Sequence, residues 1–213
     1  MRIDHAVYAV ADLDVAGRRL LVEHGLGSVP GGRHPRWGTA NRIVPLGDEY
    51  VELLSVVEPA VGRTTWLGRT IVDLSADGDR WFAVCLADDD IETTATRLGL
   101  DVTLGSRTLP DGSVVAWRSA GLEDPKREPG FPFFIDWDVP PELHPGRTPG
   151  SAHPSGAAGI SWVEIVGDGQ RLGKWLGGED VSIRAVDGSV PGVVAVGLRT
   201  SAGGELTVRR GAS

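Results

Sequence analysis

Cysteine and lysine are both scarce in this sequence. Cys85 is the single cysteine among 213 residues, so no internal disulfide can form, and its apolar neighbours indicate a buried side chain rather than a reactive thiol. Lysine occurs twice, at Lys126 and Lys174, and the acidic residues outnumber the basic ones to give a net charge of −8. Because nucleic-acid binding needs a basic footprint, we expect no nucleic-acid partner.

Long apolar runs are also missing. No segment approaches the ~18 consecutive apolar residues of a membrane-spanning helix, and residues 1–5 carry no apolar signal segment. We therefore expect a cytoplasmic protein with no membrane partner. Glycine and proline, by contrast, number 30 and 14 and fall between short apolar clusters, which is typical of many short strands and turns rather than of disorder.

Three segments of the chain repeat one pattern, beginning at Ile3, Trp81 and Ile160. Each is a short apolar strand that ends in a small residue and an aspartate, followed by a helical stretch that stops near glycine. The aspartates suit helix N-caps, and further short strands follow each helix. Each unit is therefore predicted to be a βαβββ module.

The repeat predicts an α+β fold built of βαβββ modules. One such module cannot bury its sheet face alone, so two of them are expected to pair as a half-open barrel whose concave side holds the functional site. A segment rich in proline and glycine then separates a third module. The expected divisions are a barrel over 1–138 (modules 1–57 and 80–138, connector 58–79), a linker over 139–157 and a third βαβββ-like module over 158–213.

Two polar residues of the first module, His5 and Glu52, lie within apolar strand patterns. Each shares a strand face with apolar neighbours, so each needs a partner such as a metal ion or a hydrogen bond. A satisfied His–Glu pair, or two side chains facing solvent, fits the same pattern. Position alone leaves these alternatives open.

The turn at 47–48 sets the register of the two strands around it. A two-residue hairpin turn there pairs Asn41 with Leu54. Asn41 and Thr39 then share a face with Glu52 and point into the barrel, where they bind a substrate oxygen or satisfy nearby backbone groups. A slip of one residue would place them on the outer face.

Several short motifs follow one another along the chain. They are Asp4-His5-Ala6-Val7-Tyr8-Ala9-Val10-Ala11-Asp12-Leu13, Gly31-Gly32-Arg33-His34, Gly38-Thr39-Ala40-Asn41, Tyr50-Val51-Glu52-Leu53-Leu54 and Pro132-Phe133-Phe134-Ile135-Asp136-Trp137. Their order resembles the vicinal-oxygen-chelate superfamily, and its glyoxalase-like domain family in particular. The resemblance covers roughly residues 1–166 and implies a glyoxalase/bleomycin-resistance/dioxygenase-like fold.

The resemblance implies a divalent metal held by four side chains. One module supplies a histidine from its first strand and a glutamate from its fourth, and these positions carry His5 and Glu52. Alignment of the second module places Asp136 opposite Glu52, but it places Trp81, which cannot bind a metal, opposite His5. His34, near the mouth of the first module, is a candidate for the missing ligand.

His153, in the linker, is a weaker candidate for that ligand. Imidazole and carboxylate ligands of this kind suit Zn, Fe, Mn, Ni or Mg without selecting one. The resemblance thus implies a metal-assisted lyase or isomerase, or a dioxygenase-type enzyme, acting on a small oxygen-bearing substrate. The expected metal ligands are His5, Glu52, Asp136 and His34, and the expected catalytic residues are Glu52, Asp136 and His34.

Seven tryptophans are many for this length, and three of them are expected near the barrel interior. The alternative function is a metal-free protein of the bleomycin-resistance type that sequesters a small ligand, favoured by Trp81 and by the tryptophan-rich cup. A further possibility is that the third module, left without a partner, mediates a homodimer. The expected substrate-binding residues are Asn41, Thr39, Trp37, Trp117 and Trp137.

Overall fold

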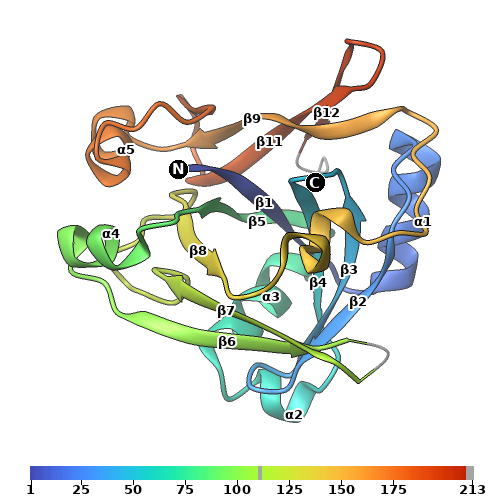
Figure 1. Cartoon of the computed structure of the whole chain (residues 1–213), viewed down its shortest axis with the longest axis horizontal. Coiled ribbons are helices and arrows are strands. Elements are labelled where there is room, and N and C mark those ends of the chain that lie inside the picture. Colours follow the sequence, from blue (N-terminus) through green and yellow to red (C-terminus); the bar gives the residue numbers. More distant parts are fainter. Residues whose placement is uncertain (110–111, 210–213) are drawn as a thin grey trace.

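The computed structural model describes residues 1–109 and 112–209, and their elements follow the predicted repeat (Figure 1). The first module contains β1 (Arg2–Ala9), α1 (Leu13–His24), β2 (Val29–His34), β3 (Thr39–Pro45) and β4 (Tyr50–Val56). The connector forms α2 (Pro59–Gly62) and α3 (Trp66–Ser75). The second module contains β5 (Arg80–Ala87), α4 (Ile91–Leu98), β6 (Val102–Thr108), β7 (Val114–Ala120) and β8 (Phe133–Trp137).

The third module has the same element order as the other two. It contains β9 (Ala157–Val166), α5 (Gly169–Leu176), β10 (Ile183–Val186), β11 (Gly192–Thr200) and β12 (Glu205–Arg209). Its predicted last residues, 210–213, lie outside the described residues. The α+β fold of repeated βαβββ modules is therefore confirmed.

One strand, β2, was not marked by the sequence pattern. Pro30, Gly31 and Gly32 are residue types that weaken strands, and they form an irregular stretch in which the pairing with β3 skips from Pro30 to Arg33. A strand of this composition is held by its neighbour rather than by its own propensity. Strand β2 also contributes His34 to the wall of the cavity inside the barrel.

The helices begin where aspartates cap them. The Asp12 side chain accepts hydrogen bonds from the backbone of residues 14 and 15, and Gly25 ends α1 in the left-handed conformation at φ 62°. In the second module the cap of α4 is Asp90, two residues later than the predicted aspartate, Asp88. None of the helices within the described ranges is long and apolar enough to cross a membrane.

Strands β1 to β8 form one closed barrel in the order β1-β4-β3-β2-β6-β7-β8-β5. The modules join through a long antiparallel ladder between β1 and β5. On the other side β2 meets β6 at a single paired position, Arg33 with Thr108. The half-open barrel expected from the sequence is thus closed, but its second seam is narrow.

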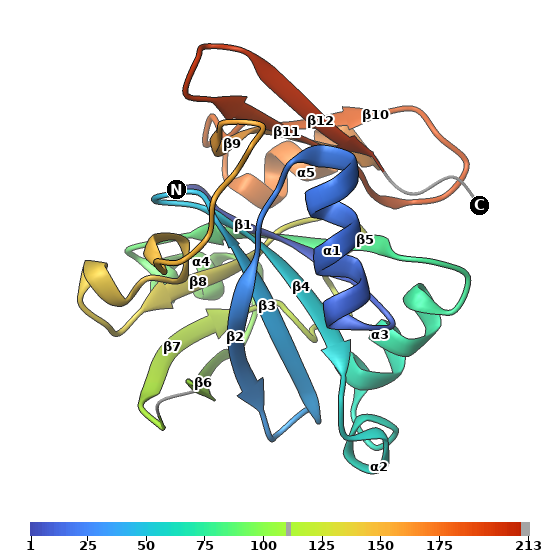
Figure 2. The same ribbon diagram turned by 90° about the vertical axis from the view of Figure 1, so that its right-hand side faces the viewer.

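The third module forms a separate sheet, β10-β9-β11-β12, that packs on the outside of the barrel (Figure 2). Its buried side chains share one hydrophobic core with the outward residues of β1 and β5, such as Tyr8 and Trp81. The indole Nε1 of Trp81 donates to the carbonyl of Val208 at 3.1 Å. Because this module is covered within its own chain, it gives no argument for the predicted homodimer.

The linker contains two short turns of 3-10 helix, η1 (Pro141–Leu143) and η2 (Pro145–Arg147), and is tied to the first module. The Gly47 amide donates to the Gly146 carbonyl at 2.9 Å. His153 accepts from the Gly27 amide at 3.1 Å and donates through Nε2 to the Pro45 carbonyl at 2.7 Å. His153 therefore anchors the linker and does not reach the barrel interior.

Candidate functional site

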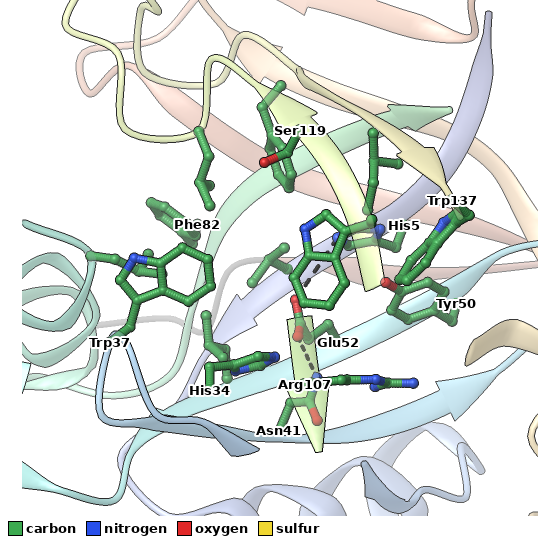
Figure 3. A pocket seen from close by; sticks show the side chains of 17 residues that line it. His5, His34, Trp37, Asn41, Tyr50, Glu52, Phe82, Arg107, Ser119 and Trp137 are labelled. Carbon is green, nitrogen blue, oxygen red and sulfur yellow. Dashed lines mark hydrogen bonds and ion pairs between the residues drawn. The ribbon is translucent and has the colours of Figure 1, made fainter. Parts of the chain in front are cut away.

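Inward-facing side chains from both modules line a cavity inside the barrel (Figure 3). Much of its wall is apolar, and the three tryptophans predicted there, Trp37, Trp117 and Trp137, all contribute to it. An apolar cavity with a small number of polar groups held at fixed positions is typical of a ligand site. The polar lining residues are His5, His34, Asn41, Tyr50, Glu52, Arg107 and Ser119.

His5 is oriented by the residue directly before it, Asp4. The β1–β5 pairing skips Asp4, and this irregularity lets the Asp4 carboxylate reach back to its neighbour. Asp4 Oδ1 lies 2.6 Å from His5 Nδ1, and its other oxygen accepts from Trp137 Nε1 and from His144 Nε2, each at 3.0 Å. His144 comes from the linker, so three segments of the chain meet at one carboxylate.

Asp4 is fully buried, and it remains ionised. Burial alone would raise the pKa of Asp4, but the hydrogen bonds from His144 and His5 outweigh burial and hold that pKa well below its usual range. Because the carboxylate can only accept, His5 Nδ1 carries the proton and His5 Nε2 presents a free lone pair to the cavity. Tyr50 stacks on the His5 ring, with centroids 4.4 Å apart, and fixes its plane.

Glu52 faces His5 from the neighbouring strand. Its Oε2 lies 3.8 Å from His5 Nε2, and its Oε1 accepts from Asn41 Nδ2 at 2.5 Å. The predicted register is confirmed, because Asn41 pairs with Leu54 and so shares the face of Glu52. The Asn41 side chain is itself fixed, since its Oδ1 accepts from the Gly32 amide at 2.6 Å. Asn41 thus positions Glu52.

His34 is the second imidazole that lines the cavity. Its Nδ1 lies 3.0 Å from the hydroxyl of Thr39, so the two predicted residues are brought together. Burial lowers the pKa of His34 to about 4, although the nearby charge of Glu52 opposes the shift. His34 is therefore neutral near pH 7.

Asp136 does not join these groups. Its neighbours on β8, Ile135 and Trp137, line the cavity, so the side chain between them points to the outer face. There its carboxylate forms an ion pair with Arg118 of β7. The structure corrects the predicted placement of Asp136 in the site, because a displacement of one residue along a strand exchanges the two faces.

The predicted alignment of the second module is also corrected at Trp81. The helix caps Asp12 and Asp90 are equivalent, and their offset of 90 − 12 = 78 residues places Ala83 opposite His5. Trp81 instead faces outward to the third module. An alanine offers no ligand atom at this position.

The same offset identifies the counterpart of Glu52. Val7 pairs with Glu52 across β1 and β4, and the equivalent residue Cys85 pairs with Phe133 across β5 and β8. The second module therefore presents Ala83 and Phe133 where a four-ligand metal centre needs two donors. These residues do not fit the metal site that the resemblance implies.

Among the described residues, one group of three candidate metal ligands has its atoms within 4.8 Å of one another: Asp4, His5 and Cys85. The Asp4 carboxylate already holds two imidazoles and an indole. Burial raises the pKa of the Cys85 thiol well above its ordinary value, so the thiol keeps its proton and is a poor ligand. The group is better described as a hydrogen-bonded cluster that supports His5.

Sequence reasoning missed four residues of the site: Asp4, Tyr50, Arg107 and His144. Asp4 and Tyr50 stand inside motifs that carried the resemblance, but their partners depend on a strand irregularity and on ring stacking. His144 lies in the linker, where a histidine followed by proline and glycine signals only a turn. Arg107 lies on β6, and nothing in its local sequence distinguishes it from a solvent-facing arginine.

Comparison with known proteins agrees with this architecture. Residues 3–177 match the family model described as a glyoxalase-like domain. No curated protein sequence matches the chain. The crystal structure of a hypothetical protein from Staphylococcus aureus is similar with a TM-score of 0.71 and 19% identity, over 94% of this chain and 91% of that one.

Weaker similarity extends to several structures of methylmalonyl-CoA epimerase. A methylmalonyl-CoA epimerase variant from Streptomyces coelicolor, in complex with 2-nitronate-propionyl-CoA, has a TM-score of 0.45 and 17% identity over 65% of this chain and 96% of its own. Methylmalonyl-CoA epimerase from Mycobacterium tuberculosis has a TM-score of 0.43 and 18% identity, over 66% of this chain and 89% of its own. Since the family model spans most of the sequence, the chain belongs to the glyoxalase-like domain family.

Proposed function

We propose that the protein is an enzyme that moves a proton at a carbon next to a carbonyl group, as a lyase or isomerase of a small oxygen-bearing substrate. One observation carries this proposal. The Glu52 carboxylate and the His5 imidazole face each other across 3.8 Å in a mainly apolar cavity. Each is held in place by a further side chain, Asn41 or Asp4, as acid–base catalysis requires.

In the proposed step Glu52 Oε2 takes the proton from the carbon. The C–H electron pair moves onto the carbonyl oxygen and forms an enolate. His34 is neutral, and a proton on its Nε2, with Nδ1 accepting from Thr39, would donate to this oxygen. His5 Nε2 can accept the proton from Glu52 and exchange it with solvent, or the proton returns to the substrate at another position.

A metal-assisted form of this reaction, or a dioxygenase reaction at a four-ligand metal, is not supported by the residues of the second module. We therefore assign no step to a metal. The predicted contacts of the substrate with Trp37, Trp117 and Trp137 stay proposals, as do a cytoplasmic location and a homodimer.

Hydrogen exchange tests the proposal. The full chain is incubated in D2O with a panel of small 2-oxo and 2-hydroxy acids and ketones, and loss of the C–H signal beside the carbonyl is followed by NMR. We expect exchange with the wild-type protein and its loss in Glu52→Gln. Asp136→Asn is the matched control, because it removes a carboxylate outside the cavity and should keep exchange.

The aromatic wall supports a second candidate, sequestration of a small ligand without chemistry. Phe82 and the three tryptophans of the cavity offer ring faces to a flat apolar molecule. Binding that Glu52→Gln leaves unchanged, together with no exchange of any substrate in the panel, would favour this candidate over the enzyme.

A further inference from the structure

Arg107 carries a buried positive charge in the wall of the cavity. Its residue is only 4% exposed, and it lines the cavity with His34 and Glu52. Its Nε is buried without a hydrogen-bond partner, and the guanidinium forms no ion pair with any carboxylate in residues 1–109 and 112–209. Burying a charge without a partner is costly, so a retained guanidinium of this kind needs a partner from outside the chain.

The surroundings hold the Arg107 side chain in the cavity. Arg107 lines the same cavity as Asn41, Glu52 and Tyr50 (Figure 3). A Cβ atom added to Gly32 would lie 3.2 Å from Arg107 Cδ, so the irregular strand β2 packs closely on the arginine stem. Arg107 also precedes Thr108, which makes the narrow seam between the modules. The stem of the side chain is thus packed against β2, and no carboxylate of the described residues pairs with its terminal nitrogens, which can therefore bind a ligand.

We propose that Arg107 binds a carboxylate of the substrate, so that the substrate class is a small 2-oxo or 2-hydroxy carboxylate with an apolar or aromatic tail. A guanidinium presents two parallel N–H donors that match a carboxylate. With the carboxylate bound there, the carbon that loses its proton, C2 of a 2-hydroxy acid or C3 of a 2-oxo acid, would lie toward the acid–base pair. The apolar wall around Phe82 and Trp37 would receive the tail.

The charges of the cavity favour a single carboxylate over a phosphate. Arg107 is the one arginine or lysine among the described residues that line the cavity, and Glu52 lies in the same space. One guanidinium can neutralise a monoanion, whereas a dianion would face the Glu52 carboxylate with no second cation to balance it. This assignment of substrate class rests on the proposed function, because it uses the same cavity.

Two probes that share a ring and a ketone, and differ in a carboxylate or a methyl group on that ketone, test the inference. Phenylpyruvate carries a carboxylate beside its ketone, and phenylacetone has the same ring and ketone without it. Binding of each to the full chain is measured by calorimetry, in the wild type and in Arg107→Gln and Arg107→Lys. We expect phenylpyruvate to bind more tightly than phenylacetone and to lose at least about tenfold in affinity in Arg107→Gln.

The affinity of Arg107→Lys for phenylpyruvate should lie between those of the wild type and Arg107→Gln, since lysine keeps the charge but not the paired donors. Phenylacetone binding should not depend on residue 107. Thermal melting checks the fold, and Arg107→Gln should melt no lower than wild type because it removes an unpaired buried charge. Equal affinity for the two probes, an unchanged affinity in Arg107→Gln, or no binding of phenylpyruvate would overturn the inference.

Glu52→Gln separates this inference from the proposed function. If it binds phenylpyruvate and the wild type exchanges no C–H proton of any substrate, the proposed function fails and the carboxylate site stands. If exchange depends on Glu52 but is equally fast for neutral ketones, the function stands and the carboxylate site fails.

Discussion

His5 Nε2 and Glu52 Oε2 lie 3.8 Å apart, on neighbouring parallel strands that place both side chains on the inner face of the barrel. The gap is longer than a hydrogen bond, so neither group donates a proton to the other directly. Two groups at this separation can both reach one substrate atom. Asp4 holds His5 and Asn41 holds Glu52 through buried hydrogen bonds, and substitution of either residue tests its role.

Replacement of Asp4 by Asn keeps the size of the side chain and removes its charge. The amide offers one accepting oxygen where the carboxylate offers two, so His5 Nδ1 or the donors of Trp137 and His144 lose their acceptor, and all three lose a charged partner. We expect C–H exchange to slow by about a hundredfold or more and the free energy of unfolding to fall by about 2–4 kcal/mol. Urea unfolding and NMR exchange measure the two effects. Exchange at the wild-type rate would show that Asp4 does not orient the imidazole.

Stability should depend on pH through His34. Unfolded His34 binds a proton below pH 6.5, but the folded residue stays neutral down to about 4. The unfolded state therefore binds more protons in this window, and stability falls as pH falls from 6.5 to about 4, by on the order of 3 kcal/mol. Asp4, whose pKa is lowered, acts only below about pH 4, where its contribution is lost.

The comparison of wild type with His34→Gln isolates this contribution. Denaturant unfolding between pH 7 and pH 4.5 should show a smaller loss of stability in the variant. Parallel pH profiles of the two proteins would mean that His34 is protonated equally in the folded and unfolded states.

Asn41→Asp places a second carboxylate where the amide now donates to Glu52. Like charges at this distance disfavour the ionised form, so the pKa of Glu52 should rise in the variant. The acid limb of the pH profile of exchange should move to higher pH. Asn41→Ala serves as the control, since it removes the donor without adding a charge and should lower the rate with a smaller displacement of the profile. If the acid limb of Asn41→Asp lay at the same pH as that of the wild type, residue 41 would not contact Glu52 in the way described.

Gly31 is required by the side chain that it packs against. A Cβ atom there would lie 2.0 Å from Asn41 Oδ1 and 3.1 Å from the Asn41 carbonyl oxygen. Gly31→Ala should therefore displace Asn41, lower stability by about 1–3 kcal/mol and slow exchange. Gly173→Ala is the matched control, because a Cβ atom at that position of α5 meets nothing within 4 Å. In thermal unfolding, the free energy of unfolding of the Gly173→Ala control should rise by up to about 1 kcal/mol.

Much of the scaffold could be predicted because it depends on local signals. The cap at Asp12 follows from residue type and position, and the two-residue turn at 47–48 fixes the pairing of Asn41 with Leu54. Repetition of the same strand–helix pattern predicts the three modules. Each of these features uses residues that are close in the sequence.

The parts of the site that escaped prediction depend on contacts between distant segments. Asp136 was placed on the wrong face by a one-residue displacement, which only the strand pairing can resolve. Asp4 reaches His5 through an irregularity in β1, and its third partner, His144, comes from the linker. The burial of Arg107 follows from the meeting of β2 and β6, whose propensities are weak.

A double-mutant cycle on the rate of C–H exchange tests the pairing of His5 and Glu52 most directly. The rates of His5→Asn, Glu52→Gln and the double variant are compared with wild type under one condition. Groups that act as a unit should give a double variant no slower than the slower single variant. A double variant whose loss equals the product of the two single losses would show that the two residues act independently.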